Sequence, residues 1–529
     1  MKKRALCLFL SLIMCLICCP FSMSKGAEST VANILEYDSR SGEKEYVITS
    51  AEGIMKFSSL ASETTFKGVT INLLCDVDMS DFSYVPFTSF SGTFNGNYNS
   101  IKNIEMVTFC ISAGFIGAIN SSGVVKNLGM ESGSIIARAS ADNERIGSIA
   151  GVNRGLIENC WSTVSVTGKR VEEASTGDIS VGGIVGGLTS NGIVKNSYFA
   201  GSVTGIDHAS GISDWCQGQN ENTVGKIINC FEAGRYSATT VYPLGRYSTS
   251  ILEANKSGAI VNSYYFHSGT VYSWAGAKKY TKAQLGSGEL AYLLDNGASS
   301  SRTRNWKKGA YFPVLGENAG VYPLMIKTKT SDGSSTSVKM YMTAGDKYTV
   351  AAGSSTCTLS SSSGSISNNT YTMPDSAATL TVTLSIPNVS AIDSVSASEY
   401  VVTNFNGFKA LGSYINGGKG TLAEKTIYMI HDIDMGNSSH TPIGIHISVS
   451  DYTKSFSGSF IGNGFKIFNL NVNNTSLNGA GLFGSSKDAY FENVGIFNGS
   501  VTANNRAGGI TGYGDYCVFK GCYNGADVT

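Results

Sequence analysis

Short apolar segments bounded by glycine recur along the chain and give its first structural prediction. Three of them are GFIG at 114–117, GSIAG at 147–151 and GGIVGG at 182–187. Segments of alternating apolar and polar residues lie between them, such as CWSTVSV at 160–166. Alternation with a period of two is typical of a strand that buries one face. The pattern therefore predicts many short strands joined by glycine turns.

A longer phrase occurs twice and indicates that these strands belong to a repeat. FSGTFNGNYNSIKNI at 90–104 returns at 456–470 as FSGSFIGNGFKIFNL. An asparagine closes each unit, and the first two closing asparagines are 24 residues apart in both copies. A matched spacing in two parts of one chain indicates stacked structural repeats. The closing asparagines are Asn103, Asn127, Asn159, Asn196, Asn229, Asn262, Asn469 and Asn493.

A unit of strand, glycine turn, strand and loop predicts an all-β protein built from right-handed parallel β-helix arrays, or a related β-solenoid. In such a stack the closing asparagines can form an internal ladder whose amides hydrogen-bond from coil to coil. Alternatively, each asparagine only supplies a turn with a left-handed backbone conformation. The side chains expected to point inward are those of Ile116, Ile149, Ile184, Val124, Leu156 and Ile193.

Short helices are predicted at the ends of the arrays. Thr49 with Glu52, and Thr281 with Gln284, have the spacing of a capping box at a helix start. The second pair leads into SGELAYLLDNG at 287–297, which is predicted to be a helix. Such helices would cover the open ends of a stacked sheet, whose bare edge would otherwise pair with other chains.

These patterns divide the chain into seven parts, and the last of them stops without a cap, which favours continuation of the stack into further repeats. The predicted parts are a signal peptide at 1–26, an N-terminal cap of a short helix and a strand at 27–89, a first array at 90–278, its C-terminal cap at 279–322, a small β module at 323–388, a second cap at 389–455, and the start of a second array at 456–529.

The first residues have the features of an export signal. A basic start is followed by an apolar run at 5–19 and then by small residues. The run is shorter than the ~20 residues that a membrane-spanning helix needs. A lipoprotein signal that uses Cys18 or Cys19 stays open as an alternative. We therefore expect an extracellular or cell-surface protein with no membrane span after signal removal.

Composition excludes some partners and bears on the cysteines. Basic and acidic residues number 39 each, so the chain has no basic footprint for nucleic acid. Cys160 and Cys230 occupy the same place in the repeat two coils apart, or roughly 9–10 Å at ~4.8 Å per coil, which is too far for a disulfide. Buried free thiols are therefore predicted. The cysteines after the signal are Cys75, Cys110, Cys160, Cys216, Cys230, Cys357, Cys517 and Cys522.

Metal and cofactor chemistry has little support in the sequence, and we expect no cofactor. The chain lacks the H-E-x-x-H motif of zinc peptidases. The histidines His208, His267, His431, His440 and His446 are interpreted as solvated loop residues, with a zinc site at the last three as an alternative. The paired acids Asp76/Asp78 and Asp432/Asp434 are expected to cap turns, and the alternative is that they bind Ca²⁺.

The repeat motifs resemble a known group of bacterial repeats. The phrases F-x-G-x-F-x-G-N and G-x-I-x-G and the asparagine-closed strand are similar to GLUG-motif repeats of surface proteins of adhesin type, which also occur in the non-catalytic region of immunoglobulin A-cleaving metallopeptidases. The resemblance covers about 45–320 and 400–529. The module at 323–388 resembles the small β repeats of internalin-type surface proteins. These resemblances imply a β-helical stalk outside the cell.

We therefore expect a secreted or cell-surface structural or adhesion scaffold without catalysis in this segment. The alternatives are a carbohydrate-active β-helix enzyme, either a polysaccharide lyase or a hydrolase, and an accessory region of a larger surface peptidase. The expected partner is a glycan or protein of a host or cell wall. Contacts to it are assigned to the loops between Asn127 and Asn229 and to Trp161, Tyr198, Phe199 and Trp215, and the alternative for Trp161 and Tyr198 is packing at the edge of the core.

Overall fold

The structure is a computed structural model, and the predicted signal peptide lies outside the residues that it describes. The described residues are 31–139, 144–171, 178–189, 191–218, 223–247, 259–267, 276–297, 299, 304–317, 320–353, 356–448, 450–474 and 478–529.

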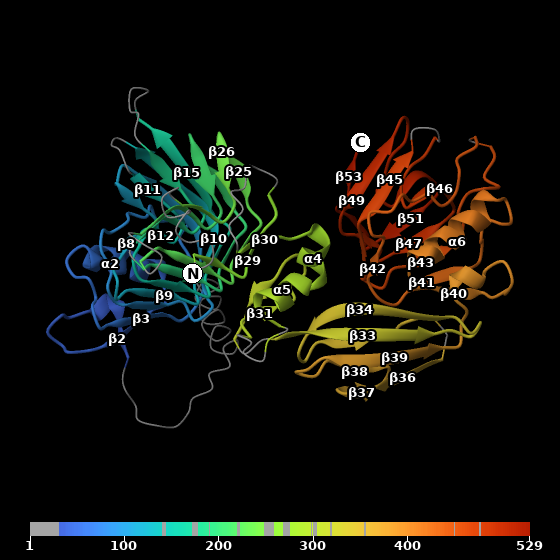
Figure 1. Ribbon diagram of the computed structural model, residues 1–529, viewed down its shortest axis with the longest axis horizontal. Coiled ribbons are helices and arrows are strands. Elements are labelled where there is room, and N and C mark those ends of the chain that lie inside the picture. The colour runs from blue at the N-terminus through green and yellow to red at the C-terminus, as the bar shows by residue number, and fades with distance from the viewer. Residues whose placement is uncertain are drawn as a thin grey trace, which may run out of the picture.

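Parallel strands stack coil upon coil in the first array, which confirms the predicted β-solenoid (Figure 1). In the coils that contain Asn127 to Asn262, one sheet carries the strands that precede the closing asparagines, and the second sheet carries the strands that follow them. The first consists of β1 (Ala32–Asn33), β2 (Glu45–Ile48), β3 (Thr70–Leu73), β5 (Thr93–Asn95), β9 (Val124–Lys126), β13 (Leu156–Glu158), β18 (Ile193–Lys195), β23 (Lys226–Ile228) and β28 (Ile260–Val261). The second consists of β4 (Val77–Asp78), β6 (Ser100–Thr108), β10 (Gly129–Ala139), β14 (Trp161–Ser162), β15 (Ser165–Arg170), β19 (Tyr198–Phe199), β20 (Ser202–Thr204), β24 (Phe231–Glu232), β25 (Arg235–Ser237), β29 (Ser263–Tyr265) and β30 (Ala277–Lys279).

Three smaller parallel sheets complete the coils of the first array. One contains β8 (Ile116–Ile119), β12 (Ala150–Asn153), β17 (Val185–Thr189), β22 (Ser213–Gln217) and β27 (Gly245–Tyr247). Another contains β7 (Ser112–Ala113), β11 (Glu144–Ile146) and β16 (Ile179–Val181), and a pair is formed by β21 (His208–Ser210) and β26 (Thr240–Tyr242).

The second array repeats this arrangement with fewer described coils. Its parallel sheets are β40 (Glu399–Val402), β41 (Thr426–Met429), β43 (Ser459–Ile461), β47 (Tyr490–Glu492) and β51 (Val518–Lys520); β42 (Ile433–Asp434), β44 (Lys466–Phe468), β48 (Gly495–Ile496) and β52 (Tyr523–Asn524); β45 (Leu470–Asn474), β49 (Gly499–Ala503) and β53 (Asp527–Val528); and β46 (Phe483–Lys487) with β50 (Thr511–Asp515).

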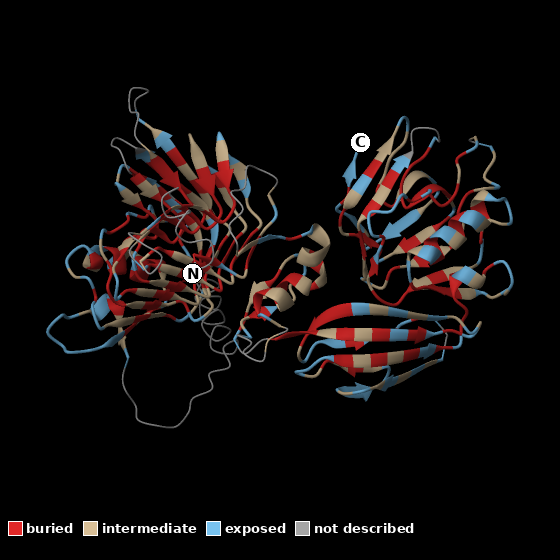
Figure 2. Cartoon of the chain, viewed as in Figure 1, coloured by how far each residue is buried: buried red, intermediate tan, exposed pale blue. Residues whose placement is uncertain are grey.

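A sandwich of two small sheets lies between the arrays in the sequence. Figure 2 shows buried residues alternating with intermediate or exposed ones along β33 and β39, as expected for strands that bury one face. The strands are β33 (Val321–Lys329), β34 (Ser335–Thr343), β36 (Cys357–Ser361) and β39 (Ala378–Leu384) in one sheet, and β35 (Lys347–Thr349), β37 (Ser365–Ser367) and β38 (Thr370–Thr372) in the other.

The predicted inward residues are correct in one part of the coil and wrong by one position in another. Ile116, Ile149 and Ile184 are fully buried. In the sheet that precedes the asparagines, however, the middle residue of each short strand is buried, and the predicted first residue is only half-buried. Two adjacent apolar residues begin these strands, so the pattern does not fix which one faces inward, and a shift of one residue reverses the face. The buried residues are Val125, Ile157 and Val194, in place of Val124, Leu156 and Ile193.

The capping helices form near the predicted places with changes at their starts. Helix α2 (Ala51–Ala61) is capped by Ser50, whose side chain accepts from the backbone N–H of Gly53, so the predicted cap at Thr49 is wrong. Thr281 caps α4 (Lys282–Ser287) through the predicted capping box with Gln284. The predicted helix at 287–297 forms as the shorter α5 (Glu289–Leu294), which begins after Gly288, whose φ of 89° ends α4. The remaining short elements are η1 (Ile34–Glu36), η2 (Val389–Ala391), α6 (Phe405–Asn416), β31 (Trp306–Lys307) and β32 (Val314–Leu315).

The C-terminal cap of the first array, at 279–322, also contacts the second array. Lys466 Nζ donates to the backbone oxygen of Gly286 at 3.0 Å and to that of Ala310, and its ammonium lies 4.8 Å from the ring centre of Phe497. A Cβ on Gly286 would lie 2.2 Å from the Phe497 ring, so only glycine permits this approach.

Among the described residues, no helix has the length and apolar character needed to cross a bilayer.

Candidate functional site

The structure brings five of the closing asparagines into one row. Asn127, Asn159, Asn196, Asn229 and Asn262 all adopt positive φ angles between 43° and 53°. Side-chain amides bridge neighbouring coils at 3.0 Å from Asn159 to Asn127, 3.1 Å from Asn229 to Asn196, and 3.0 Å from Asn262 to Asn229. The row is interrupted between Asn159 and Asn196, because the buried Asn159 Oδ1 accepts no hydrogen bond. These residues therefore supply both left-handed turns and hydrogen bonds between coils.

Asn103 and Asn469 make no such contact with another closing asparagine, which corrects their prediction as ladder residues. Asn103 donates to Asp78 at 2.9 Å, and Asn469 donates to Asp434 at 2.8 Å. Asn103 lies within β6, and Asn469 lies between β44 and β45, on a different side of the stack from the row. Asn493 follows β47 in the place that corresponds to Asn127 and has a φ of 52°.

The paired acids are engaged by neighbouring coils. Asp76 accepts from the backbone N–H of Ser100 at 2.8 Å and forms an ion pair with Lys102 at 2.9 Å. Burial would raise the pKa of Asp76, but the hydrogen bonds from Lys102 and Ser100 hold it below its usual value. Asp432 likewise accepts from the backbone N–H of Lys466 at 2.8 Å. These contacts join one coil to the next.

The interpretation of three histidines as solvated is wrong. His431, His440 and His446 are buried, with exposed fractions of 1%, 3% and 6%. His440 Nε2 lies 2.9 Å from the backbone oxygen of Leu482, and burial lowers the pKa of His440 to about 4. Across the described part of the chain, no group of three or more His, Cys, Asp or Glu residues is arranged to hold a metal ion.

Two of the aromatic residues predicted to contact a ligand belong to the packing. Phe199 is fully buried, and Tyr198 stacks on Phe231 with ring centres 4.9 Å apart and an angle of 12° between the ring planes. Trp161 is half-buried against Gly129, where a Cβ would lie 2.2 Å from the indole. These positions correct the predicted ligand contact of Phe199 and favour the alternative of core packing for Tyr198. Trp215 lies on another side of the stack, in β22.

Asp214 occupies a place in the coil that is otherwise held by glycine. The pairing of β8, β12, β17 and β22 aligns Gly117, Gly151, Gly186 and Asp214. A Cβ on Gly117 would lie 2.4 Å from a backbone oxygen, and one on Gly186 would lie 2.1 Å from a backbone nitrogen. Glycine is therefore required by the close approach of two chain segments. In the second array the same place is held by Gly484 and Gly512.

The next position along these strands changes in the same coils. Ala118, Val152 and Gly187 are aligned with Trp215, which is in turn paired with Arg246 in β27. The register between β22 and β27 shifts beside Asp214, which marks a bulge there. At this one position, three successive coils have alanine, valine or glycine, and the next two coils have a tryptophan and an arginine. We refer to Asp178, His208, Asp214, Trp215 and Arg246 as the Arg246 cluster.

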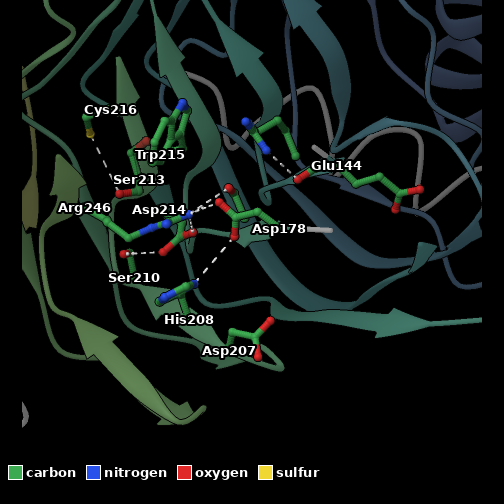
Figure 3. A network of polar contacts seen from close by, with 12 residues as sticks. Glu144, Asp178, Asp207, His208, Ser210, Ser213, Asp214, Trp215, Cys216 and Arg246 are labelled. Carbon is green, nitrogen blue, oxygen red and sulfur yellow. Dashed lines mark hydrogen bonds and ion pairs between the residues drawn. The ribbon is translucent and has the colours of Figure 1, made fainter. Parts of the chain in front are cut away.

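Arg246 connects the two carboxylates of the cluster (Figure 3). Its Nη2 lies 2.7 Å from Asp178 and 3.2 Å from Asp214. Ser210 donates to the other oxygen of Asp214 at 3.1 Å, and His208 Nδ1 lies 3.6 Å from Asp178. The contacts join residues of three coils, since Arg246 and Asp178 are 68 positions apart.

The two carboxylates have opposite electrostatic environments. Burial raises the pKa of Asp214, which is fully buried. The contacts with His208 and Arg246 lower the pKa of Asp178, whose side chain is 33% exposed. Pairs of carboxyl groups with pKa values shifted apart can divide the roles of acid and base. Only Asp178 has solvent-exposed surface for such a role in this structure.

Two arginines lie near the Trp215 ring. The guanidinium carbon of Arg246 is 4.7 Å from the ring centre, and that of Arg145 is 5.7 Å away. Gly187 makes room for Arg145, because a Cβ there would lie 2.9 Å from Arg145 Cδ. Burial lowers the pKa of Arg145. The indole is therefore placed in a strongly polar setting at the outer side of the coil.

The predictions assigned contacts to the loops between Asn127 and Asn229 but named only Trp215 of this cluster as a contact residue and interpreted His208 as a solvated loop residue, although the sequence contains a signal for the cluster. GISDW at 211–215 aligns with GGIVGG at 182–187 in the repeat, so the replacement of a required glycine by Asp214 is visible once the coils are in register. The contacts that Arg246 makes with Asp178 and Asp214 cannot be recognised in the sequence, because they depend on how the loops bring successive coils together.

Comparison with known proteins gives two partial similarities. A stretch of 113 residues, 21% of this chain, is 31% identical to Halomucin from Haloquadratum walsbyi and spans 1% of its length. The crystal structure of a "putative immunoglobulin A1 protease" from Bacteroides ovatus superposes with a TM-score of 0.35 and 19% identity, and covers 51% of this chain and 92% of that one. No protein-family model matches the chain. The likeness to Halomucin therefore concerns one segment of each protein.

Proposed function

We propose that this chain is a secreted or cell-surface scaffold with a structural or adhesion role, and that this segment is not catalytic. The observation that carries the proposal is the parallel stack of coils in both arrays. A solenoid holds an extended surface rigidly and needs no cofactor or substrate to do so. The similarity of one segment to Halomucin and the resemblance to surface-protein repeats support this function.

Export is the first part of the proposal to test. Cells that produce the full chain would be labelled with an antibody against it, before and after permeabilisation, and the medium would be assayed in parallel. We expect labelling of intact cells or recovery from the medium, and loss of both when residues 1–26 are deleted. Retention of the full chain inside intact cells would refute the proposed location.

A carbohydrate-active enzyme is the second candidate, because Asp178 and Asp214 are two carboxylates with pKa values shifted in opposite directions. The purified chain would be incubated with neutral and acidic polysaccharides, and new reducing ends and unsaturated products would be measured. We expect neither. Product formation that is lost in Asp178→Asn would replace the scaffold by an enzyme.

A further inference from the structure

The Arg246 cluster departs from the repeat in a way that the stacking of coils does not require. Glycine holds the position of Asp214 in the aligned strands β8, β12 and β17 of the first array and β46 and β50 of the second. Burying a carboxylate and a guanidinium costs several kcal/mol per ion before the two charges attract each other. Sites where a sequence breaks its own structural rule are frequently functional. The cluster therefore calls for an explanation beyond packing.

Unpartnered polar atoms are concentrated at the cluster. Arg246 Nε and Ser213 Oγ are buried and have no hydrogen-bond partner, and the buried Asp178 Oδ1 and His208 Nδ1 lie 3.6 Å apart, beyond hydrogen-bond distance. Buried polar groups in native proteins nearly always have a partner, which can be a bound molecule. The set includes an acceptor, a donor and two groups that can act as either. A ligand that both donates and accepts hydrogen bonds would satisfy it.

The cluster also has an accessible edge. The side chains of Asp178, His208 and Arg246 are 33%, 26% and 12% exposed, and Trp215 is half-buried. The indole Nε1 donates to Gln217 at 3.4 Å, which helps to hold the ring in place. A fixed aromatic ring beside polar groups is a common arrangement in sites that orient a small ligand.

Charge selects among ligands that carry many hydroxyl groups. Arg145 and Arg246 face Asp178 and Asp214, so the formal charges of these four side chains cancel. Figure 3 shows the Glu144 side chain pointing away from them. A balanced set of charges gives no advantage to a strongly acidic or basic ligand. Sugar hydroxyls, by contrast, can bind to both carboxylates and guanidinium groups.

From these observations we infer that the Arg246 cluster binds a neutral glycan, with sugar hydroxyls at Asp178, His208 and Arg246 and the sugar ring beside Trp215. The inference rests on the proposed function as a surface scaffold and specifies the ligand class of that scaffold. It assigns a place on the first array to binding and leaves the asparagine row a structural role.

The test is a glycan array that contains neutral, sialylated, uronate-containing and sulfated glycans, probed with the full chain. We expect neutral glycans to bind, and Trp215→Ala to weaken the tightest of them by about tenfold or more, as for a central aromatic contact. Tyr516→Ala is the matched control, since Tyr516 is an aromatic residue of the second array that is 81% exposed. We expect it to change affinity by less than about twofold.

His208→Gln is the second variant, in case Trp215→Ala does not fold, and thermal unfolding would establish that each variant is native. Loss of affinity in either folded variant supports the site. Binding of acidic glycans only, no binding to any glycan, or unchanged affinity in every variant that folds would overturn the inference. A chain that is displayed on cells but binds no neutral glycan would refute this inference alone, whereas an unexported chain would refute the proposed function and leave the array result standing.

Discussion

Single residues hold the coils together through backbone conformation and side-chain contacts at once. Asn229 has a φ of 52°, donates its amide to Asn196 and accepts from Asn262. Most residues other than glycine and asparagine avoid this conformation, because Cβ then approaches the following carbonyl oxygen. The contribution of the amide can therefore be separated from that of the backbone by choice of substitution.

Replacing Asn229 by glycine keeps the left-handed turn and removes only the amide contacts. We expect Asn229→Gly to cost about 1–2 kcal/mol of unfolding free energy. Asn229→Leu should cost roughly 1 kcal/mol more, because leucine is strained in this conformation. Denaturant unfolding of both variants measures the two contributions. Equal stabilities of the two variants would show that backbone strain has no part in the choice of asparagine.

Buried His440 makes the second array sensitive to pH. Its pKa is lowered by burial from an ordinary 6.5 to about 4, so between these values the unfolded chain binds a proton that the folded chain does not. Stability is then lost as pH falls from 6.5 to 4, by about 2–4 kcal/mol for a shift of this size. His440→Gln should remove this part of the pH dependence. Urea unfolding at pH 7 and pH 4.5 measures the loss of unfolding free energy between these pH values. An equal loss in the native chain and in His440→Gln would contradict the role given to His440.

At the scale of strands and helices, glycine has different meanings in different elements. In β12 a Cβ on Gly151 would lie 2.7 Å from the backbone nitrogen of Ala113, and this atom cannot move without shifting its strand. In α6 the nearest atoms to a Cβ on Gly412 belong to Ile443 and Thr441, both at 3.8 Å, which is an ordinary contact distance. One glycine is required by packing, and the other only lowers helix propensity.

Alanine substitutions distinguish these two cases. Gly151→Ala should destabilise the chain by about 1–3 kcal/mol, as for other overpacked cores. Gly412→Ala should stabilise it by roughly 0.5–1 kcal/mol, because alanine favours the helix more than glycine does. Thermal and denaturant unfolding provide the comparison. A stabilising Gly151→Ala would mean that the coils are less tightly apposed than the structure has them.

At the scale of the whole molecule, the two arrays differ in the residues at one place on their outer surface. In the second array this place contacts the C-terminal cap of the first array, at 279–322. Lys102 and Glu131 pair on the outer surface of the first array at 3.7 Å. The corresponding places in the second array hold Phe468 and Phe497, whose rings are 5.1 Å apart. Helix α4 packs its Gly286 against this apolar surface. The exchange of an ion pair for two aromatic rings therefore gives the second array a docking surface for the cap.

Restoring the charged pair should loosen the junction. Phe468→Lys combined with Phe497→Glu gives the second array the residues of the first, removes the aromatic contact with α4, and is expected to increase the radius of gyration in solution scattering. Phe109→Glu is the control, because Phe109 is 60% exposed on the first array. An unchanged scattering profile in the double variant would show that other contacts hold the two arrays together.

The sequence by itself determined the repeat, the solenoid and part of its core. The two copies of the 15-residue phrase at 90–104 and 456–470 establish stacking, because identical spacing places identical residues at the same point of successive coils. Thr281 and Gln284 likewise mark a helix start through local chemistry. These features depend on residues close together in the chain.

Only the tertiary structure decided the rest. Only there does it become clear that Val125 faces inward in place of Val124, that Asn103 lies outside the asparagine row, and that His440 is buried. The tertiary structure also brought Asp178 within 2.7 Å of Arg246 across 68 positions. The physical reason is that contacts between coils depend on strand register and on the loops inserted between strands, and neither is fixed by the period of the hydrophobic pattern.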